Sequence, residues 1–192
     1  TPSSSSAASD VYKRQIWGGQ LQRWRTGIFS ANQPDSPTAF LPDDDEPALL
    51  PYVAKMSDDL LEFAEKPKEV MIVDENGNLL LAGDNDRRFF EAAWLHKYKG
   101  KYYFSYSTGD THFICYAIGE TAYGPFTYKG RILNPVVGWT SHHSICEFKG
   151  KWYLFYHDSS LSKGVTHLRS VKIAEIKYNE DGTIQTLDPY KN

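Results

Sequence analysis

The sequence predicts an all-β fold organised as an incomplete β-propeller, and two observations support this prediction. Lys99-Gly100-Lys101 and Lys149-Gly150-Lys151 stand at the centres of two similar aromatic stretches, residues 87–107 and 142–158, which gives an offset of 149 − 99 = 50 residues. A repeat of about 50 residues made of short strands is the period expected of propeller blades. In both stretches bulky side chains alternate onto both faces of the predicted strand, which favours sheets stacked face to face.

Composition limits the class of protein. The chain has 192 residues, enough for one domain with a sizeable core, and a net charge of −3 with both signs mixed along it. These charges do not indicate a nucleic-acid or anionic-membrane partner, and no apolar run approaches the ~18 residues of a membrane span. Cys115 and Cys146 are expected to be free thiols. The aromatic content of 15% suggests sheet packing, a surface that stacks on sugars, or both.

The chain start is expected to lie outside the fold. Residues 1–15 resemble translated adaptor sequence, with a disordered natural tail as the alternative, and the fold is predicted to occupy residues 16–192. The sequence therefore predicts no localisation. Residues 16–29 combine tryptophans with paired glycines, which favours a strand that bends. Residues 30–48 form a polar loop whose acid run lacks the spaced ligands and glycine of a calcium loop.

The next elements are predicted as strands. Apolar spacing over residues 51–67 suits a helix when taken alone. However, residues 113–130 and 167–184 both run in the order strand, polar turn, strand, and residues 51–67 follow the same order. We therefore predict strands at 53–56 and 63–64 around a turn. Asn76-Gly77 indicates a second hairpin, between residues 70–73 and 79–81.

Two later hairpins carry the candidate site. Residues 94–98 and 101–106 are joined by Lys99-Gly100, a two-residue turn with glycine where positive φ is needed. Adding 50 to Glu91 gives position 141, one residue short of His142. Glu91 and the pair His142-His143 therefore occupy equivalent places in two repeats. Equivalent places in propeller blades converge around the central axis, so these side chains are expected to meet.

Four motifs together resemble glycoside hydrolase family 43, whose members are five-bladed propellers that remove arabinofuranosyl or xylosyl units from plant polysaccharides. The resemblance covers roughly residues 16–190, so about three to four blades are expected. Its motifs are Glu91 before WLHKYKGKYY, YGPFTYKG at 123–130, HHSICEFKGKWYLFYH at 142–157, and LRSVKIAEIKYNEDGTI at 168–184.

The resemblance implies an inverting hydrolysis with Glu91 as the general acid. Such an acid protonates the leaving oxygen while a carboxylate base about 6.5–9.5 Å away activates water, and the pKa of the acid is raised by burial or by a like charge. The family's base and pKa-modulating aspartates belong to the first two blades. Residues 1–90 contain no matching first-blade motif, and Trp17-Gly18-Gly19 resembles the segment after the second aspartate. The chain is therefore expected to lack both the base and the pKa-modulating aspartate, and to have little or no activity alone.

The resemblance also implies roles for other residues. His142, or alternatively His143, is expected near the axis in contact, directly or through water, with a metal ion such as calcium. Calcium prefers oxygen ligands, and a packed histidine is the other interpretation. Arg169 is expected to hold a sugar hydroxyl or the modulating carboxylate, with an exposed edge arginine as the alternative. The aromatic residues expected to stack on sugar rings, or else to pack in the core, are Phe90, Trp139 and Trp17.

Two other functions stay open at this point. The first is a propeller that binds oligo- or polysaccharides without hydrolysing them, which the missing base and the many aromatic residues favour. The second is an interaction module with no sugar site. That alternative would be favoured if Glu91 and His142 lay more than roughly 15 Å apart, because the two side chains would then share no axial site.

Overall fold

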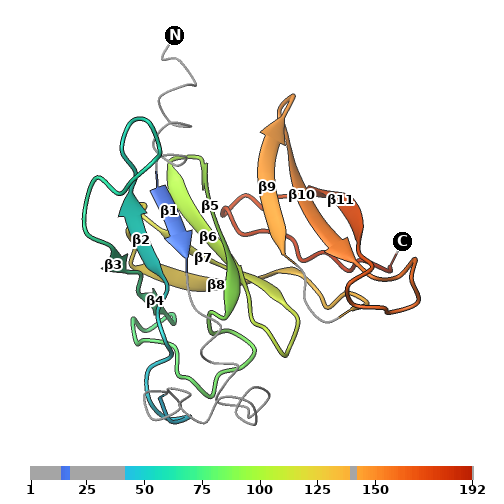
Figure 1. Cartoon of the computed structure of the whole chain (residues 1–192), viewed down its shortest axis with the longest axis horizontal. Helices are drawn as coiled ribbons and strands as arrows, with labels where there is room; N and C mark the ends of the chain where they lie inside the picture. The colour runs from blue at the N-terminus through green and yellow to red at the C-terminus, as the bar shows by residue number, and fades with distance from the viewer. Residues whose placement is uncertain (1–13, 18–41, 139–141, 192) are drawn as a thin grey trace.

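A computed structural model describes residues 14–17, 42–138 and 142–191, and within these residues the fold is all-β with no helix. The strands form three separate sheets (Figure 1). Their bounds are β1 Arg14–Trp17, β2 Tyr52–Lys55, β3 Lys68–Glu69, β4 Ile72–Val73, β5 Glu91–Tyr98, β6 Lys101–Ser107, β7 Ile114–Gly119, β8 Phe126–Leu133, β9 His143–Phe148, β10 Lys151–Asp158 and β11 Ser170–Ile176.

The central sheet contains the unit expected of a propeller blade. Its strand order is β4-β8-β7-β6-β5, in which β5 to β8 form an antiparallel meander and β4 pairs with β8 in parallel. The sheet β9-β10-β11 stands beside it as a separate antiparallel sheet, and β1-β2-β3 forms the third (Figure 1). The two aromatic hairpins therefore lie in two different sheets and not in one continuous sheet.

The turns of the two hairpins confirm the structural repeat. Lys99 and Gly100 have φ values of 45° and 84°, and Lys149 and Gly150 have φ values of 51° and 75°. Two consecutive residues with positive φ define the mirror-image turn that matches the twist of antiparallel strands. The same two-residue loop thus closes both hairpins, 50 residues apart.

Strand β6 is covered on both faces, as predicted. Tyr102, Phe104 and Tyr106 belong to one core cluster, with β2 and β4 residues such as Val53 and Ile72. Tyr103 belongs to a second cluster that also contains apolar residues of β9, β10 and β11. The sheet β9-β10-β11 therefore packs against the face of β6 that carries Tyr103.

Strand β10 differs from this expectation, because in the described part of the chain only one of its faces is covered. Leu154 and Tyr156 are buried in the second cluster, while Phe155 on the other face is only half-buried. On the adjacent strand β11, Val171 is 76% exposed and Ile173 is 60% exposed. The prediction of two covered faces thus holds for the first hairpin and not for its repeat.

The strand prediction for residues 51–67 is confirmed. This segment contains β2 and an isolated antiparallel bridge from Met56 to Phe63, so the repeat outweighs the helical spacing. β1 pairs with β2 and begins at Arg14 rather than at the expected residue 16. In the described ranges the structure has no helix that is long and apolar enough to cross a membrane. Cys115 and Cys146 are free thiols.

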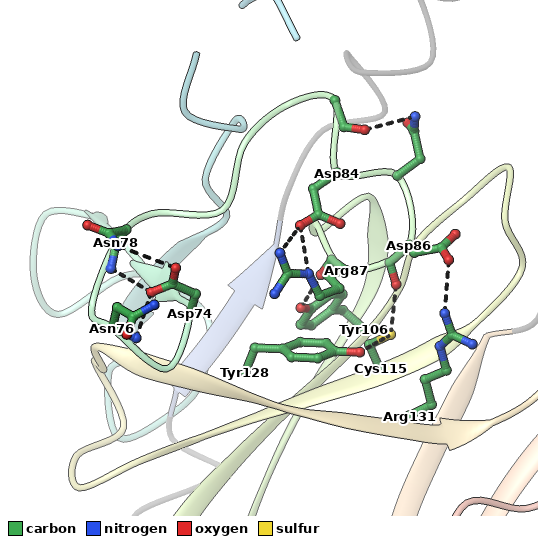
Figure 2. Close-up of polar contacts among 12 residues, drawn as sticks. Asp74, Asn76, Asn78, Asp84, Asp86, Arg87, Tyr106, Cys115, Tyr128 and Arg131 are labelled. Carbon is green, nitrogen blue, oxygen red and sulfur yellow. Dashed lines mark hydrogen bonds and ion pairs between the residues drawn. The ribbon is translucent and has the colours of Figure 1, made fainter. Parts of the chain in front are cut away.

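The predicted Asn76-Gly77 turn is also present. Asp74 accepts hydrogen bonds from the backbone N–H groups of Asn76 and Asn78 at 2.9 and 2.8 Å (Figure 2). These bonds lower the pKa of Asp74 from its ordinary value. Gly77 has a φ of 85°, and the bridge from Val73 to Leu79 closes the hairpin.

Candidate active site

Glu91 is the first residue of β5 and is buried, with 7% of the residue exposed. It pairs with Ser107 of β6, and the preceding N–H, that of Phe90, donates to the Ser107 carbonyl oxygen at 3.0 Å. The register of β5 on β6 shifts between Glu91 and Trp94, and Ala92 within this interval has a φ of 60°. The candidate acid therefore sits directly beside a β-bulge, a feature that changes the direction of neighbouring side chains.

The loop before Glu91 is held by an internal ion pair and by β6 (Figure 2). Arg87 Nε donates to Asp84 Oδ2 at 2.7 Å, and the Tyr106 hydroxyl donates to the Arg87 carbonyl oxygen at 2.5 Å. Burial raises the pKa of Tyr106 well above its ordinary value, so this hydroxyl stays a donor. Arg88 Nε donates to the Ala82 carbonyl oxygen at 2.8 Å, which closes the loop on itself.

Strands β7 and β8 hold the same loop at Asp86 (Figure 2). Arg131 Nη2 of β8 lies 2.9 Å from Asp86 Oδ2, and Cys115 Sγ of β7 donates to the Asp86 carbonyl oxygen at 3.5 Å. Burial raises the pKa of Cys115 to about 12, so the thiol remains protonated and acts as a donor. Contacts from three strands thus fix the backbone that leads into Glu91.

His142 lies next to Glu91, as predicted from the repeat. Its Nε2 is 3.4 Å from Glu91 Oε1, although Glu91 opens β5 of the central sheet and His142 directly precedes β9 of another sheet. The Glu91 side chain is buried, whereas the His142 side chain is about half exposed. A separation of more than roughly 15 Å would have favoured the interaction-module alternative, and this short distance gives that alternative no such support.

Two more residues, His157 and Arg169, continue the series of polar contacts that begins with Glu91 and His142. His157 Nε2, at the end of β10, accepts a hydrogen bond from the His142 backbone N–H at 3.1 Å. Arg169 Nη1 lies 3.5 Å from the same ring nitrogen, and its Nε donates to the Thr166 carbonyl oxygen at 2.9 Å. Burial, followed by the nearby Arg169 charge, lowers the pKa of His157, so this ring is suited to accept. Arg169 is therefore exposed but connected to the site.

His143 takes the packed alternative. Its Nε2 lies 2.7 Å from Ser105 Oγ of β6, and burial lowers the pKa of its imidazole to about 3. A neutral buried ring that bonds the neighbouring sheet serves to join β6 to β9. The repeat did not identify His157, yet it contained the signal, because Ser107 pairs with Glu91 and 107 + 50 = 157.

The aromatic candidates have separate outcomes. Phe90 is buried, and its ring lies against Gly109, where an added Cβ would come within 2.6 Å of Phe90 Cγ. Packing accounts for Phe90 as it stands, and the ring presents no open face to a sugar. Trp17 is the last residue of β1, and its stacking role stays a prediction. Trp139 lies outside the described residues.

The described residues do not by themselves form the expected calcium site. In the ranges 42–138 and 142–191, no group of three or more His, Cys, Asp or Glu side chains is placed to hold a metal ion. Glu91 and His142 together offer one carboxylate and one imidazole, whereas calcium takes six to eight oxygen ligands. The contact of His142 with calcium therefore stays a prediction.

Comparison with protein families identifies the class of this chain. The profile of glycosyl hydrolases family 43 matches residues 46–184. The chain belongs to this family, and the resemblance inferred from the four motifs is confirmed.

Named relatives support the same assignment. The chain is 57% identical over 178 residues to a xylosidase/arabinosidase of Bacteroides ovatus, which covers 93% of this chain and 53% of the relative. It is also 57% identical over 184 residues to xylosidase/arabinosidase 43A of Humicola insolens, with coverages of 93% and 55%. The chain thus spans about half the length of the curated relatives it matches.

Solved structures agree in fold. A GH43 β-xylosidase/α-arabinofuranosidase from a compost microbial metagenome, solved in complex with xylotriose in a calcium-free form, is 61% identical and superposes with a TM-score of 0.84. This comparison covers 93% of this chain and 55% of that enzyme. A GH43_1 enzyme from Xanthomonas citri complexed with xylotriose is 50% identical, with a TM-score of 0.82 over 93% of this chain and 53% of that chain.

Proposed function

We propose that this chain is part of a glycoside hydrolase that removes xylosyl or arabinofuranosyl units from plant oligo- or polysaccharides, with Glu91 as the general acid. The observation that carries the proposal is the buried Glu91 carboxyl group 3.4 Å from His142, at the junction of two sheets in a family 43 chain. The printed names of the relatives, xylosidase/arabinosidase, support the substrate class.

The proposed reaction inverts the anomeric carbon. Glu91 gives its proton to the glycosidic oxygen as the bond to the anomeric carbon breaks, and a carboxylate base on the opposite face of the sugar removes a proton from the attacking water. Residues 1–90 contain no first-blade aspartate motif, so we expect the base to come from outside this chain. The chain alone is then expected to have little or no activity.

The three sheets are proposed to be blades of a five-bladed propeller. The 50-residue repeat, the antiparallel meander β5 to β8 and the likeness to the metagenomic β-xylosidase support this proposal. In this arrangement Glu91 and His142 face the axis, where His142 holds the acid in place. Arg169, which contacts His157 and through it His142, is proposed to bind a sugar hydroxyl.

The test uses a chimera in which this chain replaces the matching part of the metagenomic β-xylosidase. We expect the chimera to hydrolyse xylobiose and aryl xylosides. Glu91→Gln should lower kcat on xylobiose by roughly 10²- to 10⁴-fold, the usual contribution of a general acid. The loss should be smaller on an aryl xyloside whose phenol leaves without protonation. Glu147→Gln, which changes an exposed carboxylate of β9, is the matched control.

Two outcomes would contradict the proposal. One is full activity of Glu91→Gln on xylobiose. The other is a folded chimera that hydrolyses neither substrate but binds xylotriose saturably in calorimetry, which would favour the non-hydrolytic sugar-binding alternative.

A further inference from the structure

Ala92 has an unusual backbone conformation for its place in the fold. Among the described residues, six non-glycine residues have positive φ: Leu60, Ala92, Lys99, His112, Lys149 and Lys163. Of these, Ala92 is the one that lies within a strand. Left-handed conformations of non-glycine residues are strained and concentrate at functional sites. This residue directly follows the proposed acid.

The bulge at Ala92 decides which face of the sheet carries Glu91. On β5, Glu91 and Trp94 are three residues apart, but their partners on β6, Ser107 and Ser105, are two residues apart. In a regular strand, residues three apart point to opposite faces. The extra residue of the bulge instead places Glu91 and Trp94 on the same face, because their partners share one face.

This shared face is the one turned toward His142. The indole Nε1 of Trp94 donates to the Ile145 carbonyl oxygen of β9 at 3.2 Å, and Ser105 bonds to His143 at 2.7 Å. Both bonds join the central sheet to the sheet β9-β10-β11. A regular β5 would therefore turn the Glu91 carboxyl group away from that sheet.

We propose that Ala92 is a positioning residue, whose left-handed conformation turns Glu91 onto the face shared with Trp94 and holds its carboxyl group beside His142. This inference rests on the proposed function of Glu91. Glycine adopts the left-handed region freely, and asparagine is enriched there, whereas a β-branched residue is a genuine outlier. The substitutions at position 92 should therefore rank by how readily each residue adopts positive φ.

The experiment measures leaving-group dependence in the chimera described above. Ala92→Val should lose roughly 100-fold or more in kcat on xylobiose, comparable to the loss of a general acid, and much less on the aryl xyloside, with KM little changed. Ala92→Gly should keep kcat on both substrates within about threefold, because it retains the conformation. Lys149→Val is the matched control, since it puts the same residue into a left-handed position far from Glu91 in the hairpin turn.

The outcomes separate the positioning role from the function itself. Equal losses of Ala92→Val on both substrates, or unchanged activity, would overturn the positioning role. Activity retained by Glu91→Gln would instead overturn the proposed function. If Ala92→Val does not fold, Ala92→Asn and Ala92→Ser replace it, and Asn should retain more xylobiose activity than Ser. The reverse order would overturn the inference.

Discussion

His96 should make this fold sensitive to mild acid. It lies in β5 and is 5% exposed, with its ring centroid 5.0 Å from that of Tyr103 and 5.2 Å from that of Trp152. Its Nε2 lies 2.7 Å from the Tyr178 hydroxyl oxygen. Burial, with a smaller contribution from His143, lowers the pKa of His96 to about 3. The folded protein therefore keeps this ring neutral well below pH 6.

The sign and size of the effect follow from proton linkage. In the unfolded chain His96 has an ordinary pKa of about 6.5, so the unfolded state binds the proton first as the pH falls. The free energy of unfolding is therefore largest above about pH 6.5 and decreases below it, toward about pH 3. One such histidine changes the slope by about 1.4 kcal/mol per pH unit, or about 2 kcal/mol between pH 6.5 and 5. His143, with its pKa also lowered to about 3, acts in the same direction.

The assay is urea unfolding of the chain between pH 7 and pH 5, followed by tryptophan fluorescence. His96→Gln keeps a polar group near the Tyr178 hydroxyl but removes the titrating ring. The slope of its free energy of unfolding against pH should therefore be smaller, by the equivalent of nearly one bound proton. The substitution also changes the free energy of unfolding by a constant amount at every pH, because packing is lost. This constant difference does not affect the comparison of the two slopes. His167→Gln, which makes the same replacement at an exposed histidine, is the matched control. Parallel curves for wild type and His96→Gln would refute the reasoning.

Two further predictions concern packing, and thermal unfolding checks both. Gly109→Ala should destabilise by about 2–4 kcal/mol, because φ is 80° and the new Cβ would lie 2.6 Å from Phe90 Cγ. Gly100→Ala, with a φ of 84° and nothing within 4 Å, should cost about 1 kcal/mol, and equal losses would contradict the steric account. Leu154→Ala, at a fully buried site, should cost about 2–5 kcal/mol, against less than about 0.5 for Leu161→Ala at an exposed one. Similar costs at the two leucines would show that burial does not decide them.

The sequence was informative where the signal is local and repeated. A lysine-glycine pair predicts the two-residue turn by itself, and its recurrence after 50 residues predicts two equivalent hairpins. From this, the meeting of Glu91 with His142 follows as a geometric consequence. The same logic correctly replaced a helix by strands in residues 51–67, because three segments shared one order of elements.

Other features depend on contacts that no local pattern encodes. A strand with bulky residues on both faces does not say which faces are covered in a given chain. The alternation in β10 therefore predicted two covered faces, whereas the described residues cover one. Similarly, the position of Phe90 beside Glu91 suited either a sugar platform or the core. Its packing against Gly109 depends on a loop that follows β6.

The bulge at Ala92 accounts for an irregularity of one residue in the 50-residue repeat. Downstream of the bulge the repeat offset is 50, because Trp94 pairs with Ser105, and Ser144, at 94 + 50, pairs with Phe155, at 105 + 50. At Glu91 the offset becomes 51. The partner of Glu91, Ser107, corresponds to His157, at 107 + 50. The last pair of β9 and β10 is His143 with Tyr156, so His142, the residue before it, lies opposite His157. The mismatch of one residue between position 141 and His142 is therefore the extra residue of the bulge. A repeat count that slips by one beside a candidate catalytic residue predicts a bulge there, because insertion of one residue is the smallest change that moves a side chain to the other face of a sheet.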